Sequence, residues 1–464
     1  MLNDLITKRK SEFHPGTHTE LRAQISKNRA ITLVSGNLTA NTRNEVSGVS
    51  ARVYKNGVYG FSSAASYDDD AVKSVLDAAK NNADFMDTHL KKQKPMFPPQ
   101  ESGSRFADTE SLNKRELPPR TYIDFAKQLD GYISNTYPSL ASRVIAIRED
   151  SMEKFLAVSD GYDTHFISPR SYVYVFLTAE TKDGMPVELF APIGGYGSFG
   201  ENFTDPALLY PKVDELHAKL MQKREGVFAK AGLKTVVLGG DLSGMLAHEA
   251  VGHTVEADLV LGGSVAGHNL GKKVASDLIS LVDFAHTAFD KPAPLPVYVD
   301  DEGVPATDAL LIDKGNLVGY MNNRETAHHF GMKPNGNARA FLFSDEPLIR
   351  MRNTAVLPGS NKLDDLIASV DDGYYLISSN NGQADTTGEF MFGITMGYEI
   401  KGGKLGHAIL DTTITGVAFE MLKTVDMVSD SMNWSSSGYC GKKQQMPVSV
   451  GGPELRCKVT IGGR

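Results

Sequence analysis

Residues 235–253 read TVVLGGDLSGMLAHEAVGH, a buried strand that leads into a helix carrying two histidines. The apolar run 235–238 followed by two glycines is typical of a strand that ends at a turn, and Asp241 is the expected cap of the helix. The helix pattern that precedes this strand ends within residues 226–234. Because 464 residues exceed the usual size of a single core, we predict two domains that meet here, 1–230 and 231–464.

His248 and His253 are five residues apart and enclose Glu249. A metalloprotease helix usually has the pattern H-E-x-x-H, in which both rings face one metal ion. On an ideal α-helix, five residues rotate by about 500°, which leaves the two rings roughly 140° apart. Gly252 would permit a π-bulge or a helix end that returns both rings to one face. The run alone leaves two interpretations open, a zinc site or histidines that are solvated or satisfied in the core.

Cys440 and Cys457 are the only cysteines, too few for a disulfide framework. Cys457 lies in an alternating segment, 455–461, and is predicted to be a core residue of a strand. Cys440 lies in a glycine-flanked segment beside two lysines, which we expect to be a turn that favours a thiolate. It is therefore the better third ligand. Two imidazoles and one thiolate leave one coordination position open, as in catalytic zinc sites.

The N-terminal domain is predicted to mix α and β structure. Short strands are expected between residues 17 and 62, with a hairpin turn at 55–57. Helices are expected after residues 68–70, from about Arg120, and through Val213, Leu216 and Leu220. Residues 91–119 contain several prolines and are predicted to form an exposed loop.

The C-terminal domain is predicted to be mostly β. Residues beyond the histidine helix are rich in glycine and β-forming residues, with turns at 301–303, 314–316 and 401–403. The expected fold class is α+β, in which a mixed α/β domain precedes a β-rich barrel or sandwich that carries the metal-binding helix.

Composition restricts the partners. The net charge of −8 argues against a nucleic-acid surface and favours peptides or small molecules. The first residues lack the apolar core of a signal peptide, and no stretch approaches the ~20 apolar residues of a membrane helix. We therefore expect a cytoplasmic protein without nucleic-acid or membrane partners.

Further polar residues have more than one interpretation. Glu256, three residues after His253, is a fourth ligand, a partner that orients His253, or an ordinary helix carboxylate. Arg324, His328 and His329 lie in a run predicted to be a solvated helix. A peptidase also needs a donor to the oxyanion of its tetrahedral intermediate, and the sequence does not identify that donor.

Several separated segments together resemble the TldD branch of the TldD/PmbA metalloproteases. They are 48–62, 248–253, 300–305, 438–442, 447–451 and 461–463. The resemblance implies a zinc metallopeptidase that hydrolyses unstructured peptides through a metal-activated water in the bacterial or archaeal cytoplasm. It assigns His248, His253 and Cys440 as zinc ligands and Glu249 as the general base. It also implies a dimer, either a homodimer or a heterodimer with a noncatalytic paralogue.

Two other functions stay open at this point. The chain could be a noncatalytic binding or scaffold subunit of a peptidase complex, as the PmbA-like branch is thought to be. It could also be a zinc-dependent amidase of small molecules, which uses the same activation of water. The intact histidine and glutamate run together with Cys440 favours the peptidase, because the PmbA-like branch lacks that run.

Overall fold

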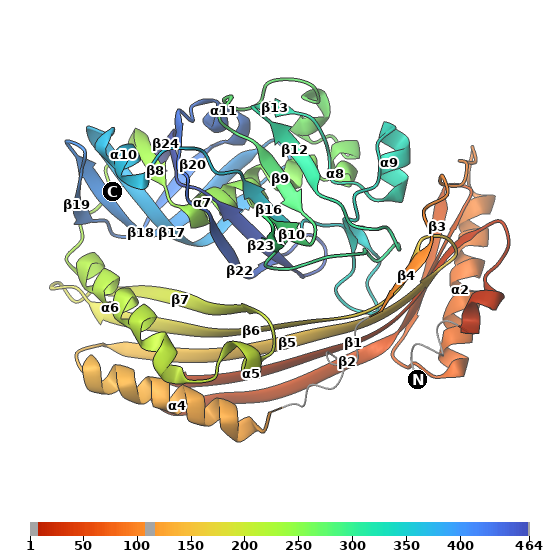
Figure 1. Ribbon diagram of the computed structural model, residues 1–464, viewed down its shortest axis with the longest axis horizontal. Helices are drawn as coiled ribbons and strands as arrows, with labels where there is room; N and C mark the ends of the chain where they lie inside the picture. Colours follow the sequence, from red (N-terminus) through yellow and green to blue (C-terminus); the bar gives the residue numbers. More distant parts are fainter. Residues whose placement is uncertain (1–7, 107–116, 463–464) are drawn as a thin grey trace.

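The computed structural model of the protein describes residues 8–106 and 117–462 (Figure 1). A long curved sheet from the N-terminal half forms one layer, and two smaller sheets from the C-terminal half pack around a buried helix above it. This arrangement confirms the α+β fold class. The domain boundary near residue 230 stays a prediction, and strand β8 begins at Gly232.

The N-terminal sheet contains strands much longer than the short strands expected from the sequence. Its order is β3-β2-β1-β5-β6, and both β4 and β7 pair with β6. The predicted hairpin turn is present, because Asn56 and Gly57 have φ values of 52° and 108° between β2 and β3. The strands are β1 His18–Val34, β2 Asn37–Lys55, β3 Val58–Ala64, β4 Gly103–Phe106, β5 Ser142–Val158, β6 Tyr162–Glu180 and β7 Pro186–Tyr196.

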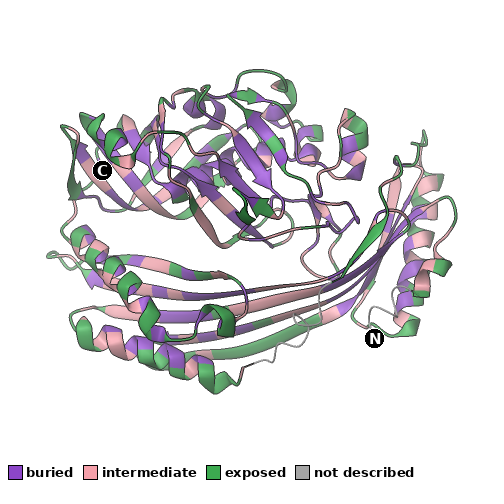
Figure 2. Ribbon diagram, viewed as in Figure 1, coloured by how far each residue is buried: buried purple, intermediate pink, exposed green. Residues whose placement is uncertain are grey.

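The first part of β1 is buried on both faces (Figure 2). Its apolar residues, such as Leu21 and Ala23, pack against helix α2 (Asp69–Thr88). Its polar residues face the C-terminal half, where Arg22 donates to the carbonyl of Phe343 and Gln24 donates to the carbonyl of Phe341. Apolar and polar residues alternate along this strand, so its apolar face packs against a helix and its polar face packs against the C-terminal half. The contact of the polar face cannot be predicted from the alternation.

Helices cover the outer face of the N-terminal sheet (Figure 1). Helix α2 begins where predicted, because the carboxylate of Asp68 accepts the N–H of Ala71. Helices α4 (Pro119–Thr136) and α6 (Tyr210–Arg224) share a core with the far ends of β1, β5 and β6. The predicted loop 91–119 contains strand β4, and its residues 107–116 lie outside the described residues.

Five strands of the C-terminal half close into a barrel. The order is β17-β8-β24-β20-β18, and β18 pairs back to β17. Cys457 is a buried core residue of β24, as predicted. The barrel strands are β8 Gly232–Leu238, β17 Asp372–Ala384, β18 Glu389–Lys401, β20 Thr412–Val417 and β24 Leu455–Gly462, with β19 Lys404–Ala408 and β21 Met427–Val428 attached.

A six-stranded sheet lies beside the barrel in the order β13-β12-β9-β16-β23-β22. Its strands are β9 Leu281–Phe284, β12 Ala309–Asp313, β13 Asn316–Leu317, β16 Asn353–Val356, β22 Asn433–Cys440 and β23 Met446–Gly452. Two short pairs complete the β structure, β10 Thr287–Ala288 with β11 Lys291–Pro292 and β14 Ala338–Arg339 with β15 Leu348–Ile349. The remaining helices are η1 Arg9–Glu12, α5 Phe199–Asn202, η2 Pro206–Leu209, α8 Ala257–Leu261, η5 Val265–His268, α9 Arg324–Phe330, α10 Leu363–Ala368 and α11 Ala418–Lys423.

The helix that follows β8 is buried between the barrel and the six-stranded sheet. It starts as α7 (Gly240–Met245), and its N-cap is Gly239 rather than the predicted Asp241. Asp241 lies in the first turn, where a carboxylate suits the positive end of the helix dipole. A Cβ atom at Gly244 would lie 2.8 Å from the amide nitrogen of Gly451, so the helix backbone rests directly on β23. This contact fixes the position of the helix and therefore the position of the two histidines that follow.

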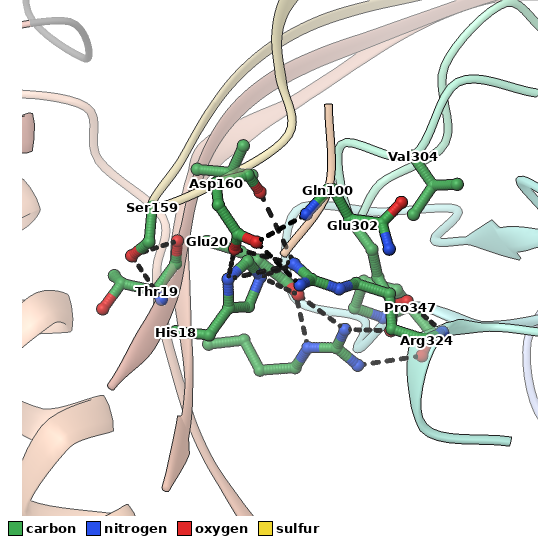
Figure 3. A network of polar contacts seen from close by, with 12 residues as sticks. His18, Thr19, Glu20, Gln100, Ser159, Asp160, Glu302, Val304, Arg324 and Pro347 are labelled. Carbon is green, nitrogen blue, oxygen red and sulfur yellow. Dashed lines mark hydrogen bonds and ion pairs between the residues drawn. The ribbon is translucent and has the colours of Figure 1, made fainter. Parts of the chain in front are cut away.

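A buried network of charges joins the N-terminal sheet to the C-terminal half (Figure 3). Arg52 of β2 donates to both carboxylate oxygens of Glu20 on β1, at 2.8 and 2.9 Å, and to Glu302 of the C-terminal half at 2.5 Å. All three side chains are buried. The two carboxylates offset the cost of burying the positive charge of the guanidinium, and the guanidinium links one half of the chain to the other.

Arg324 is buried in the same network, whereas the sequence predicted a solvated helix. Its guanidinium donates to the two carboxylate oxygens of Asp160 at 2.9 Å each, and its backbone N–H donates to Glu302. Burial opposes ionisation of Asp160, but hydrogen bonds from His18 and Arg324 lower the pKa of its carboxyl group. Only His328 and His329, at the end of α9, are exposed as expected.

Replacing Arg52 with methionine should lower the free energy of unfolding by about 3–5 kcal/mol, because Glu20 and Glu302 would stay buried without their guanidinium partner. Urea denaturation followed by circular dichroism measures the change. The matched control is Arg120→Met, whose side chain is 88% exposed and pairs with Asp124, and this change should cost less than ~1 kcal/mol. Equal unfolding midpoints for the two variants would contradict a stabilising network.

Candidate metal centre

The histidine helix switches to π-helical hydrogen bonding over Leu246–Gly252 (η3). The N–H of His253 donates to the carbonyl of His248, five residues earlier, and a 3-10 turn (η4, His253–Val255) follows. This pattern confirms the predicted distortion near Gly252. It brings residues five apart onto one face, so the two imidazole rings lie 5.1 Å apart between centroids.

Gly252 allows this turn because it has no side chain, and other atoms already fill the space that a side chain would occupy. A Cβ atom there would lie 2.2 Å from Sδ of Met351 and 3.0 Å from the carbonyl oxygen of Ala247. Both distances are below ordinary van der Waals contact. A residue with a side chain would therefore push the π-helical turn away from Met351 and move the adjacent His253.

Cys440 meets the two histidines from the six-stranded sheet. It is the last residue of β22 and pairs with Met446 of β23, which corrects the prediction that it lies in a turn. Its Sγ lies 3.5 Å from Nε2 of His253, and one ligand atom from each of His248, His253 and Cys440 falls within 4.8 Å of the others. The fold thus joins residues almost two hundred positions apart.

The three donors suit a soft divalent metal ion such as zinc. Tetrahedral zinc with one imidazole and one thiolate ligand would separate the two donor atoms by about 3.6 Å, close to the 3.5 Å between Nε2 of His253 and Sγ of Cys440. Among the described residues, Nδ1 of His248 is buried without a hydrogen-bond partner. Geometry, donor chemistry and an unpaired buried nitrogen all fit a bound metal.

Hydrogen bonding controls the protonation of this cluster. Burial opposes a thiolate, but hydrogen bonds from His248 and His253 lower the pKa of Cys440 to about 3. Burial also opposes a charged imidazole, yet hydrogen bonds to Cys440 and Glu256 raise the pKa of His253 to about 10. Without metal the two side chains therefore form a thiolate–imidazolium pair, and a metal ion that binds there must displace a proton from His253.

Glu249 lies next to the cluster without joining it. Its carboxylate oxygens are 3.9 Å from Nε2 of His248 and 3.7 Å from Nε2 of His253. The side chain keeps 26% of its surface exposed, unlike His248 at 3%. A carboxylate that solvent can reach beside the donor atoms is placed to exchange a proton with a water molecule at the site.

Glu256 is a buried partner of His253. Its Oε2 lies 2.8 Å from Nδ1 of His253, which leaves Nε2 of that ring facing Cys440. Lys442 stands 3.3 Å from the same oxygen and donates to Asp258 and to the carbonyl of Ile349. Of the interpretations that the sequence left open for Glu256, this geometry supports the one in which it orients His253.

The N-terminal sheet holds the strand that carries Cys440. From β6, Tyr172 and Tyr174 donate to the carbonyls of Ser436 and Ser437 on β22, at 2.5 and 3.2 Å. Arg170 of β6 also donates to the hydroxyl of Tyr439 at 2.5 Å. From the opposite side, Arg350 donates to the carbonyl of Cys440 itself at 2.7 Å. No local sequence pattern predicts these supports, because nothing near a tyrosine or arginine indicates that its partner is a distant backbone carbonyl.

Comparisons with known proteins identify the family. A model of the PmbA/TldA metallopeptidase C-terminal domain matches residues 231–463, half of the chain, and a model of PmbA/TldA metallopeptidase domain 1 matches residues 19–83. The chain belongs to this family. A metalloprotease from Methanothermobacter thermautotrophicus is 29% identical over 96% of this chain and 95% of that protein. A zinc metalloprotease TldD homolog from Saccharolobus solfataricus is 34% identical over 53% of this chain and 56% of that protein.

Solved structures share the architecture. TldE from Thermococcus kodakarensis has a TM-score of 0.77 at 16% identity, with 99% of each chain covered. A putative modulator of a DNA gyrase from Thermotoga maritima has a TM-score of 0.74 at 18% identity, with 98% of each covered. At these identities the similarity shows the fold alone. The family and the names of the relatives indicate a metalloprotease, and within the described residues no helix has the length and apolar character to cross a membrane.

Replacing Gly252 with alanine should destabilise the protein by about 1–3 kcal/mol and weaken metal binding, because the new Cβ displaces the turn that carries His253. Thermal unfolding and metal content measure the two effects. The matched control is Gly131→Ala in α4, where nothing lies within 4 Å of the new Cβ and alanine favours the helix. If both variants bound metal as the parent does, the packing at Gly252 would not control the site.

Proposed function

We propose that this protein is a zinc-dependent metallopeptidase of the TldD-like branch that hydrolyses unstructured peptides. The observation that carries the proposal is the convergence of His248, His253 and Cys440 within 4.8 Å, with the carboxylate of Glu249 beside them. Three protein ligands leave one position for water or substrate, which is the arrangement of catalytic zinc sites. A name among the relatives, zinc metalloprotease, supports the choice of metal.

The residues of the chain have separate tasks in this reaction. A bound zinc ion would supply a Lewis acid that lowers the pKa of a water at the open position to about 7. Glu249 accepts the proton of the attacking water and then delivers it to the nitrogen of the leaving amine. Glu256 holds the Nδ1–H of His253, so that Nε2 stays directed at the cluster. No covalent bond between enzyme and substrate is needed.

A noncatalytic scaffold is the main alternative, and the donor set argues against it. A scaffold subunit has no need of three converging metal ligands with a partly exposed carboxylate beside them. A zinc-dependent amidase of small molecules would use the same residues, and substrate length distinguishes it from a peptidase. The dimer, with itself or with a noncatalytic paralogue, and the cytoplasmic location stay predictions of the resemblance.

Cys440→Ala should lose bound zinc and peptidase activity together, because it removes one of three ligands. Glu249→Gln should keep about one zinc per chain and lose turnover by about 10²–10⁴-fold, because only proton transfer is removed. Elemental analysis and hydrolysis of unstructured peptides measure both.

The matched control for the cysteine is Cys457→Ala, which removes a buried cysteine of the barrel and should keep metal and activity. Full zinc content in Cys440→Ala would remove that residue from the ligand set. Normal turnover in Glu249→Gln would remove the general base. Hydrolysis of small amides without hydrolysis of peptides would favour the amidase.

Glu256→Ala should weaken zinc binding by about 10–100-fold, because the ring of His253 loses the acceptor that orients it. Competition with a chromogenic chelator measures the affinity. The control is Asp258→Ala, which removes a second carboxylate bound to Lys442 but does not touch His253. A loss of the same size in both variants would assign the effect to Lys442 rather than to the orientation of His253.

A further inference from the structure

A cavity of about 600 Å³ lies between the N-terminal sheet and the C-terminal half, and its wall includes Met446, the strand partner of Cys440. Its walls come from β4, β5 and β6 on one side and from residues 295–301, Arg339, Met446 and Pro447 on the other. Met446 pairs with Cys440 across β22 and β23, so the cavity wall is one strand spacing, ~5 Å, from a metal ligand. The size suits a segment of a peptide.

Arg339 is one of the cations that line this cavity; Lys154 pairs with Asp301, and the guanidinium of Arg105 stacks over the ring of Tyr298 at 3.7 Å. Arg339 lies on β14, is half-buried, and donates from Nη1 to the carbonyl of Met351 at 2.6 Å. Met351 is the residue packed against Gly252, so this hydrogen bond places Arg339 next to the turn that carries His253. Over residues 8–106 and 117–462, no carboxylate forms an ion pair with its guanidinium. The remaining N–H groups are therefore available to a ligand.

Neighbouring arginines increase the excess of positive charge. Arg350 donates only to carbonyls, those of Gln444 and Cys440, and Arg352 already pairs with Asp283 at 2.9 Å. Burial, followed by repulsion from Arg350, lowers the pKa of Arg339 to about 9, so the side chain is still charged at neutral pH. Arg339, Arg350 and Arg352 thus lie near one another, and among the described residues only Arg352 forms an ion pair, with Asp283.

Neither aspartate that lines the cavity forms an ion pair with Arg339 among the described residues, and the favourable effect of the Asp301 charge on the pKa of Arg339 is smaller than the effects of burial and of Arg350. Asp301 accepts hydrogen bonds from Lys154 at 2.7 Å and from the N–H of Ala340 at 2.8 Å. Asp300 accepts three backbone N–H groups, and burial raises the pKa of its carboxyl group. An anionic ligand is the group that would complete this site.

We propose that the cavity binds a carboxylate of the peptide substrate through the guanidinium of Arg339. A planar guanidinium with free donors recognises a carboxylate by two parallel hydrogen bonds, and the partly buried setting strengthens them. Tyr196, which is 42% exposed on the cavity wall, offers apolar surface to a neighbouring substrate side chain, whereas the ring of Tyr298 is stacked by the guanidinium of Arg105 at 3.7 Å. The carboxylate belongs either to the end of the chain or to an acidic side chain.

This inference rests on the proposed peptidase function and specifies its substrate. A carboxylate held by Arg339, whose hydrogen-bond partner Met351 packs against Gly252, would place the bonds near that carboxylate closest to the candidate metal centre. Cleavage should then occur close to the carboxyl end of a peptide, or close to an acidic residue. Peptides that lack both should bind weakly.

The test uses zinc-loaded Glu249→Gln protein and fluorescence anisotropy, so that peptides bind without being cleaved. The probes are a labelled hexapeptide of alanine, glycine and leucine with a free carboxyl end, its carboxyl-terminal amide, and the same amide with one internal glutamate. The free acid should bind at least about tenfold more tightly than the amide. Tight binding of the glutamate amide instead would assign the carboxylate to a side chain.

Arg339→Gln should abolish this preference, Arg339→Lys should keep part of it, and the exposed control Arg120→Gln should leave it unchanged. Unfolding midpoints and zinc content confirm that each variant is folded and loaded. Equal affinity of all three peptides for the parent protein would overturn the inference, as would an unchanged preference in Arg339→Gln. If the wild type cleaved no peptide, the proposed function would fail while the binding preference still tested Arg339.

Discussion

The hydrogen bond from the N–H of His253 to the carbonyl of His248 is the interaction on which the candidate metal centre depends. In an α-helix these residues would face different directions, and no single ion could contact both rings. The five-residue hydrogen bond turns them to one side, and the absence of a side chain at Gly252 lets Met351 press against that turn. Since the helix lies between the barrel and the six-stranded sheet, neither end of the turn is free to relax into regular α-helix.

The charges of the centre are balanced by residues from three different elements. Glu256 and Lys442 fix His253 from one side, while the thiolate of Cys440 accepts hydrogen bonds from the two imidazoles on the other. Arg350 binds the carbonyl of Cys440 and adds positive charge behind the thiolate. A buried thiolate and a buried carboxylate are each costly alone, and here each faces a cation or a hydrogen-bond donor.

The sequence predicted the parts of this site that depend on local spacing. The run from His248 to His253 and the glycine at 252 predicted the distorted helix, and the neighbourhood of Cys440 predicted a third donor. It did not predict that Arg324 is buried, because its partners Asp160 and Glu302 come from a distant strand end and a distant loop. The length of the N-terminal strands was also missed, and the polar residues at the start of β1 are covered by the C-terminal half.

The N-terminal sheet therefore does more than enclose the site. Strand β22 has an irregular register between Ser435 and Gly438, so its own ladder to β23 is interrupted just before Cys440. Tyr172 and Tyr174 of β6 bind the carbonyls within that interruption, and they replace the missing strand contacts. Position of the third ligand is thus shared between both halves of the chain. A movement of the N-terminal sheet would reach the metal centre through β22, and the same movement would change the wall of the cavity that Arg339 lines.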